Sequence, residues 1–217
     1  MIVSPGRGYV FVHAPKTGGT ALTLALEARA RADDILIGDT PKARRRRRRL
    51  DGARTEGRLW KHSTLADIRG LLPDATLDAL TPVMTVRNPW DRMVSYWHWL
   101  RAQDFDHPAV RAAKASDFKD FVADPQVGES FRRAPYASYV AGGRAPVHLR
   151  LEHLRTDLAA FERLLGFPLE VPRANASDRG RDWRDYYDAR ARDRVAEVCA
   201  ADIAAFDYRF DDPLPPA

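Results

Sequence analysis

A strand, a glycine-rich turn and a helix follow one another near the start of the chain, and this order constrains the fold more than any other feature. The segment "YVFVHA" (residues 9–14) is rich in β-branched and aromatic residues and ends at Pro15, which predicts a short buried strand. "KTGG" (16–19) follows, and "TALTLALEARARA" (20–32) has apolar residues at helical spacing. A turn of this kind gathers the unpaired N–H groups at the start of the helix, where proteins bind anions. The segment therefore predicts an α/β fold with an anion-binding loop.

The lysine of this loop is not where an ATP-binding loop has it. In the G-x-x-x-x-G-K-[ST] pattern the lysine follows the last glycine, whereas here Lys16 precedes Gly18 and Gly19. Glycines let the backbone approach an anion closely, Lys16 adds a point charge, and Thr17 and Thr20 add hydroxyl groups. The loop predicts a site for a 5′-phosphate or a phosphosulfate, and an ordinary tight turn between strand and helix is the alternative.

A second strand-to-helix junction repeats the same design. "PVMTVR" (82–87) predicts a buried strand, and Asn88 is a suitable cap for the helix that follows. Arg87 has a planar guanidinium suited to a second phosphate, and Ser95 lies two turns into the helix. The alternative is that Arg87 forms an ion pair with Asp91.

The remaining pattern alternates strands and helices. We predict a strand end at 58–62, helices at 63–72, 116–124 and 185–206, and a strand over 146–154 that leads into a helix closed by Gly166. This alternation predicts an α/β fold with a mainly parallel sheet in a single domain over residues 1–217.

Charge and composition narrow the class of protein. The chain has 217 residues, a net charge of +5 and one cysteine, Cys199, which excludes an internal disulfide and a zinc set of cysteines. We expect Cys199 to be buried in a helix. Because no run of 18 apolar residues occurs, we expect a soluble, cytoplasmic chain with no membrane span.

Six consecutive arginines occupy residues 44–49. Such a dense run of like charges predicts a solvated, flexible, Arg-rich loop over residues 32–58. The alternatives are an electropositive lip for an acidic acceptor and, with less support, nuclear import or nucleic-acid binding.

Together, the two junctions suggest one ligand with two separate anionic groups. "HAPKTGGTAL" (13–22) resembles the 5′-phosphosulfate loop of the sulfotransferase superfamily, which uses 3′-phosphoadenosine 5′-phosphosulfate (PAPS) as donor, and "TVRNPWDRMVSYW" (85–97) resembles its 3′-phosphate segment. "LRLEHLRTDLAAFERLLGF" (149–167), "NAS" (175–177) and "DIAAFDYRF" (202–210) resemble later segments of that family. The likeness is greatest to the branch of the carbohydrate sulfotransferases. It implies a P-loop-NTPase-like three-layer fold with a mainly parallel central sheet flanked by helices.

The resemblance also implies roles for particular residues. Lys16 would contact the sulfonate and the bridging oxygen, and Arg87 and Ser95 would bind the 3′-phosphate. The 5′-phosphate would be held by Thr17, Gly18, Gly19, Thr20 and Ala21. The product would be adenosine 3′,5′-bisphosphate (PAP), and no metal would be needed.

The acceptor hydroxyl needs a base, and histidine is the default because its pKa lies near neutral pH. We select His62, which lies between the two junctions in the sequence; some carbohydrate sulfotransferases have a similar catalytic histidine. A surface or capping role for His62 is the alternative, and Glu56 is a second candidate base. His98 lies among the tryptophans of residues 90–99, which fit either the core or a stacking wall for the acceptor or for adenine.

The sequence thus predicts a PAPS-dependent sulfotransferase that acts on a hydroxyl of a small molecule or saccharide, possibly acidic, with no nucleic-acid partner. A P-loop kinase that uses ATP and Mg²⁺ is one alternative. A non-catalytic nucleotide- or polyanion-binding module, with the arginine run as its working surface, is the other. Segment 106–145 aligns poorly with the family, so the acceptor is the least determined part.

Overall fold

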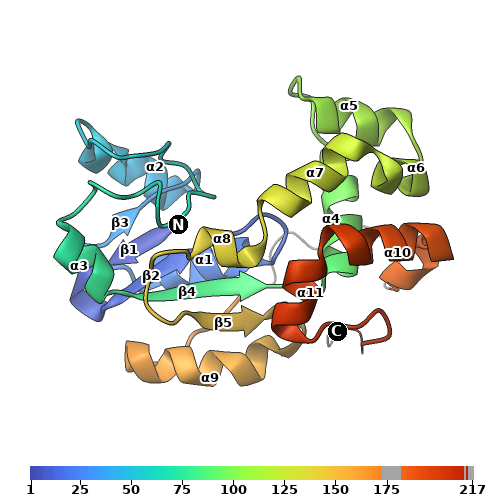
Figure 1. Cartoon of the computed structure of the whole chain (residues 1–217). Coiled ribbons are helices and arrows are strands. Elements are labelled where there is room, and N and C mark those ends of the chain that lie inside the picture. The colour runs from blue at the N-terminus through green and yellow to red at the C-terminus, as the bar shows by residue number, and fades with distance from the viewer. Residues whose placement is uncertain (173–181, 213, 215–217) are drawn as a thin grey trace. The chain divides into compact units, whose positions relative to one another are not determined.

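The computed structural model describes residues 1–172, 182–212 and 214, and their contacts separate two compact units (Figure 1). The first, here called the sheet unit, comprises Met1–Val86 and Ser138–Asn175. The second, the helical unit, comprises Arg87–Ala137 and Ala176–Ala217. Each unit is described by itself below. In the described part of the chain, no helix is long and apolar enough to cross a membrane.

The sheet unit is built on an open mixed sheet, so the prediction of an α/β fold is confirmed. The described strands are β1 (Ile2–Ser4), β2 (Tyr9–Val12), β3 (Ile35–Leu36), β4 (Thr81–Val86) and β5 (Val147–Arg150), in the order β3-β1-β2-β4-β5 (Figure 1). β2 pairs in parallel with β4, and β4 in parallel with β5, whereas β1 is antiparallel to both β2 and β3.

The prediction of a mainly parallel sheet is wrong, and the reason lies in the first residues of the chain. A 3-10 turn at Pro5–Arg7 and a left-handed Gly8 (φ 71°) reverse the chain between β1 and β2. The proline and glycines of "SPGRG" are turn signals, but the predicted alternation of strands and helices did not include them. The antiparallel hairpin was therefore not predicted. The three-layer arrangement of P-loop NTPases is not confirmed either.

Two helices of the sheet unit share one face of the sheet. α1 (Gly19–Ala28) and α9 (Leu154–Leu165) contribute to one apolar cluster with the side chains that alternate along the strands, including Phe11 and Leu149. The rings of Tyr9 on β2 and Phe161 on α9 meet edge to face at 5.2 Å. Gly166 caps α9 in the left-handed conformation, which confirms that prediction.

The stretch between β3 and β4 differs from the prediction. The strand end predicted at 58–62 and the helix predicted at 63–72 are both wrong, because these residues form turns. The Asp67 carbonyl accepts from the Gly57 N–H at 3.0 Å instead of from a helical N–H, and Gly70 has a φ of 85° that a helix excludes. The described helix before β4 is α3 (Asp74–Ala79).

The arginine run is largely helical. α2 (Pro41–Arg46) and a 3-10 turn (Arg47–Leu50) contain all six arginines, and Thr40 caps α2 by accepting from the Ala43 N–H at 3.1 Å. Pro41 at the first helical position and Thr40 before it are signals of a helix start that the charge run obscured. Most of the arginine side chains are exposed, as expected of a solvated run.

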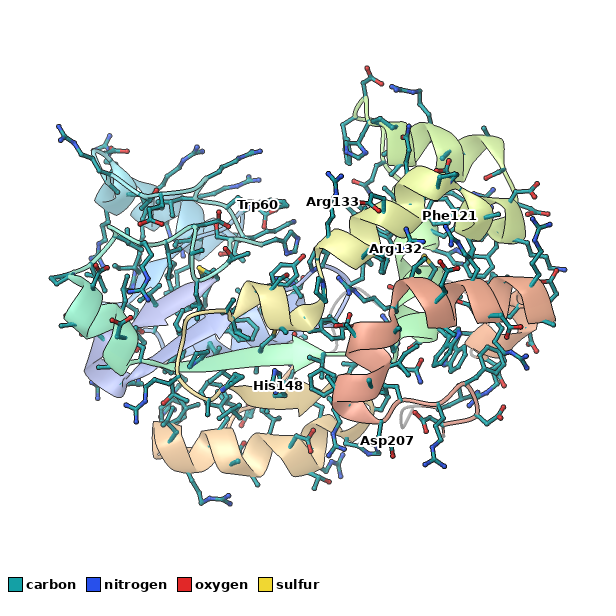
Figure 2. The ribbon with its side chains drawn as sticks, in the orientation of Figure 1. Trp60, Phe121, Arg132, Arg133, His148 and Asp207 are labelled. Atoms are coloured by element: carbon teal, nitrogen blue, oxygen red, sulfur yellow. The ribbon has the colours of Figure 1, made fainter. Side chains whose placement is uncertain are left out.

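The helical unit packs its helices around an aromatic and aliphatic core that includes Phe121 (Figure 2). The described helices are α4 (Pro89–Arg101), α5 (Pro108–Ala115), α6 (Phe118–Ala123), α7 (Pro125–Arg133), α10 (Ala189–Val198) and α11 (Ala200–Phe206), with a 3-10 turn at Trp183–Tyr186 and the short α8 (Tyr136–Tyr139) at the boundary of the two units. Asn88 caps α4 by accepting from the Trp90 N–H at 3.1 Å, which confirms the predicted helix start. The single helix predicted at 185–206 is wrong, because Cys199 separates α10 from α11.

Candidate functional site

The loop between β2 and α1 is tied to the neighbouring strand β4. The Thr17 hydroxyl donates to the Ala14 carbonyl at 2.9 Å, and this leaves Thr85 as the donor in the 2.8 Å contact between the two threonine hydroxyls. Thr17 is completely buried. Its hydroxyl, which we expected to face a phosphate, therefore fixes the loop to the carboxyl end of β4, and the Thr17 backbone is its remaining means of contacting a ligand.

The backbone of the loop takes two left-handed turns. Lys16 has a φ of 67° and Gly18 a φ of 79°, and Gly18 is the N-cap of α1. Left-handed residues between right-handed ones turn successive N–H groups to one side, which creates the concave sites that bind anions. A Cβ on Gly18 would lie 2.7 Å from a methyl carbon of Leu151, so the glycine also allows close approach of the segment after β5. The predicted residues Gly19, Thr20 and Ala21 form the first turn of α1.

His13 is buried under this loop. A Cβ on Gly19 would lie 2.2 Å from Cδ2 of His13, so only glycine leaves room for the imidazole. Burial lowers the pKa of His13 well below 6.5, and the nearby charges of His62 and Lys16 lower it further. His13 is therefore a neutral ring that supports the start of α1, with Lys16 and His62 both close enough to affect its charge.

The fold brings His62 to the same loop. His62 Nδ1 lies 2.6 Å from the carbonyl oxygen of His13, and the two rings meet edge to face at 4.7 Å. Because a carbonyl can only accept, Nδ1 carries the proton and Nε2 is the basic nitrogen. Burial lowers the pKa of His62 to about 4; the hydrogen bond to His13 opposes this shift, and the charge of Lys61 adds to it. His62 is thus a neutral base of fixed tautomer.

The competing bases lie in other surroundings. Glu56 lines an open pocket of about 490 Å³ with Arg54 and Arg69, on a different part of the sheet unit's surface from the pocket beside His62 described below. In the helical unit, His98 Nε2 lies 2.8 Å from the Tyr186 hydroxyl. His98 is therefore part of aromatic packing, with its ring edge to face with Trp97.

Arg87, which we predicted to bind a 3′-phosphate, forms a buried ion pair with Asp91. Arg87 Nε and a terminal nitrogen both lie 2.7 Å from Oδ2 of Asp91, and both side chains are nearly inaccessible. The pairing that we considered as the alternative is therefore present. Asp91 orients the guanidinium, and Tyr136 fixes the backbone by donating from its hydroxyl to the Arg87 carbonyl at 2.8 Å. Ser95 is buried one turn beyond Asp91, on the same face of α4.

The tryptophans of residues 90–99 are mostly core residues. Trp90 and Trp97 are buried in the core of the helical unit, whereas 37% of Trp99 is exposed. The "NAS" segment at 175–177, with Arg179 and Gly180 after it, lies outside the described residues. Among the described residues, no group of three or more His, Cys, Asp or Glu side chains is arranged to hold a metal.

Sequence reasoning missed two residues that shape the site. Thr85 is polar within an otherwise apolar buried strand, and this was a usable signal that its hydroxyl has a specific partner. Trp60 lies edge to face with His62 at 4.9 Å, and we passed over it because "RLWKH" resembled a strand end. The predicted residues thus form two groups: Lys16 and His62 with the loop in the sheet unit, and Arg87 and Ser95 in the helical unit.

Comparison with known proteins found no match to any protein-family model, curated protein or solved structure.

Proposed function

We propose that the chain is a PAPS-dependent sulfotransferase that transfers a sulfuryl group to a hydroxyl of a saccharide. The observation that carries this proposal is the combination of Lys16 and His62 at one loop. Lys16 supplies a cation at a left-handed position before the N-terminus of α1, and His62 supplies a neutral imidazole hydrogen-bonded to the same loop. A site that transfers a charged group to a hydroxyl needs both a fixed cation and a base.

In this proposal the loop holds the 5′-phosphosulfate. The backbone N–H groups at Gly18, Gly19 and Thr20 face the phosphate with the positive end of the α1 dipole. Sulfuryl transfer resembles phosphoryl transfer, in which a loose in-line transition state is stabilised by positioning and charge. Lys16 stabilises the negative charge that grows on the bridging oxygen as the bond between sulfur and that oxygen breaks.

His62 acts on the acceptor. As the acceptor oxygen forms its bond to sulfur, its proton passes to Nε2 of His62, and PAP leaves with the bridging oxygen. The low pKa of His62 keeps the imidazole neutral throughout the physiological pH range. The negative charge of a bound donor favours the imidazolium and so raises the proton affinity of His62 when a proton must be accepted.

The helical unit supplies the second anion-binding group. Arg87, oriented by Asp91, and Ser95 would bind the 3′-phosphate that distinguishes PAPS from ATP. A P-loop-like arrangement of the sheet unit is part of the proposal. It rests on the order β2, loop, α1 and on the parallel pairing of β2 with β4.

The donor is tested by calorimetric titration with adenosine 3′,5′-bisphosphate and, separately, with ATP, each with and without Mg²⁺. We expect micromolar binding of the bisphosphate without metal. Lys16→Met and Ser95→Ala should each weaken binding of the bisphosphate about tenfold, because each removes about one charge-assisted hydrogen bond to it. Lys119→Met, at an exposed lysine of α6, is the matched control. Tighter binding of ATP that requires Mg²⁺ would replace the proposal with a kinase.

The transfer itself is tested with PAPS and a panel of neutral and acidic saccharides, with the sulfated product detected by mass spectrometry. His62→Gln should lower kcat about 10²- to 10⁴-fold with little effect on bisphosphate binding, because a base acts in the chemical step. Unchanged turnover in this variant would remove His62 from the mechanism. Binding of the bisphosphate that survives both Lys16→Met and Ser95→Ala would favour the non-catalytic polyanion-binding module.

A further inference from the structure

A second pocket of the sheet unit lies beside His62. It has a volume of about 270 Å³, and its lining combines apolar groups such as the buried Leu36 and Ile37 with Trp60. Its charged lining residues are three cations and one carboxylate: Arg47, Arg58, Lys61 and Asp39. Ligand pockets commonly measure about 300–1,000 Å³. A pocket slightly smaller than this range fits one ring-sized group rather than a whole nucleotide.

Two of the three cations are available for an anionic ligand. Lys61 is paired with Asp39 at 2.8 Å. Within the described residues, neither Arg47 nor Arg58 has an acidic partner, and both are exposed. An arginine with no acidic partner at the rim of a pocket is suited to a carboxylate or a sulfate, which its planar fork can bind through two hydrogen bonds.

The arginines of residues 44–49 make different contacts. Arg46 donates to the carbonyl of Arg31 at 2.7 Å, and Arg49 donates to the carbonyl of Ala32, so these two fasten α2 and the turn after it to the rest of the sheet unit. Arg47, between them in the sequence, lines the pocket instead. A run that served only as a solvated loop would not need this fastening.

Trp60, whose side chain is labelled in Figure 2, lines this pocket and is 42% exposed, and hydrogen bonds hold its backbone in place. The backbone N–H of Trp60 donates to the hydroxyl of the fully buried Ser63 at 2.9 Å. That hydroxyl lies 2.8 Å from the Arg58 carbonyl oxygen. The Arg58 guanidinium lies over one face of the Trp60 ring, 5.7 Å from the ring centre, so a ligand would use the other face. An exposed aromatic face fixed beside cations fits a ligand that has both an apolar C–H face and a negative charge.

We propose that this pocket binds an anionic pyranose, a sugar ring that carries a carboxylate or a sulfate. The C–H face of the ring lies on Trp60, and the anionic group is bound by Arg47 and Arg58. Binding does not depend on any transfer reaction. The further assignment of the pocket as the acceptor subsite rests on the proposed function, and it follows from the edge-to-face contact of Trp60 with His62 at 4.9 Å.

The test is an NMR titration of the full chain with methyl β-D-glucuronide and methyl β-D-glucoside, which differ only in the carboxylate at C6. A ligand of this size with ordinary efficiency should bind with a Kd on the order of 1 mM. We expect the glucoside to bind about tenfold more weakly. Arg47→Ala/Arg58→Ala should reduce glucuronide binding to the level of the glucoside, and Trp60→Leu should weaken both sugars.

The matched control is Arg45→Ala/Arg48→Ala, which removes two exposed arginines of the same run that do not line the pocket. Equal binding of the two sugars, equal loss in the control variant, tighter binding of benzoate than of the glucuronide, or displacement of the glucuronide by adenosine 3′,5′-bisphosphate would each overturn the proposal. Preference for a single-stranded oligonucleotide that is lost in both double variants would do so too.

The two proposals fail in different ways. Glucuronide binding that depends on Arg47 and Arg58, with no transfer from PAPS, supports the pocket and contradicts the sulfotransferase. Transfer from PAPS that is unaffected by Arg47→Ala/Arg58→Ala contradicts the acceptor subsite and leaves the sulfotransferase in place.

Discussion

Because His62 is neutral in the folded chain, acid lowers the free energy of unfolding by a measurable amount. Its pKa falls from 6.5 to about 4 on folding, mainly because the imidazole is buried. Below pH 6.5 the unfolded chain therefore binds a proton that the folded chain refuses, and the free energy of unfolding falls until the pH approaches about 4. Between about pH 7.5 and about pH 5, the linkage relation gives a loss of about 2 kcal/mol from this one residue.

The measurement is urea unfolding at both pH values for the wild type and His62→Gln. Burial also lowers the pKa values of His13 and His148. His148 is present in both proteins and cancels in the difference, and His13 nearly cancels, because burial rather than His62 is the main cause of its shift. The variant should lose about 2 kcal/mol less on acidification. His153→Gln, at an exposed residue of the sheet unit whose side chain makes no cap hydrogen bond, controls for the substitution itself. If wild type and His62→Gln respond to pH within about 0.5 kcal/mol of each other, the usual error of additivity, the burial argument is refuted.

Three further predictions concern packing and charge. Gly19→Ala places a Cβ 2.2 Å from the His13 ring and should destabilise the chain by about 1–3 kcal/mol in chemical unfolding. In a His13→Ala background the same change should be neutral or stabilising, because alanine favours a helix. Asp91→Asn removes the carboxylate that two nitrogens of the buried Arg87 guanidinium contact and should cost about 3–5 kcal/mol, whereas the double change Arg87→Met/Asp91→Leu should recover most of it. Cys199 is buried with its pKa raised to about 12, so it should react with thiol reagents only after unfolding; rapid labelling of the folded chain would contradict this.

The sequence was informative where a local signal and the tertiary structure agree. The caps at Asn88 and Gly166 and the strand at 9–12 were predictable, because each depends on residues within one turn or one run. The hairpin of β1 with β2 was not predictable in the same way, because its signal is confined to a four-residue turn after a strand of only three residues. The helix predicted at 63–72 failed because the carbonyls of Asp67 and Arg69 accept from Gly57 and Glu56, which lie outside that segment.

In the candidate site, too, local features were predictable and contacts between residues far apart in the sequence were not. The loop residues and the burial of His13 were predictable from the order of strand, glycines and helix. The role of the Thr17 hydroxyl was not, because its partner Thr85 is 68 residues away in the sequence. Trp60 was missed for a similar reason: its importance comes from a pocket assembled by β3, α2 and a turn, none of which indicates the pocket alone.

The electrostatics of the loop connect these observations. Burial disfavours a proton on both His13 and His62, so both imidazoles beside the loop are neutral. Lys16 and Lys61 lower the pKa of His13 as well, so the positive charge near these imidazoles comes from lysine side chains. Once the anion is bound, its field favours protonation of the nearby histidines. Since Nδ1 of His62 is already committed to the His13 carbonyl, the proton can only enter at Nε2. The hydrogen bond that fixes the tautomer thus also decides which atom of His62 is basic.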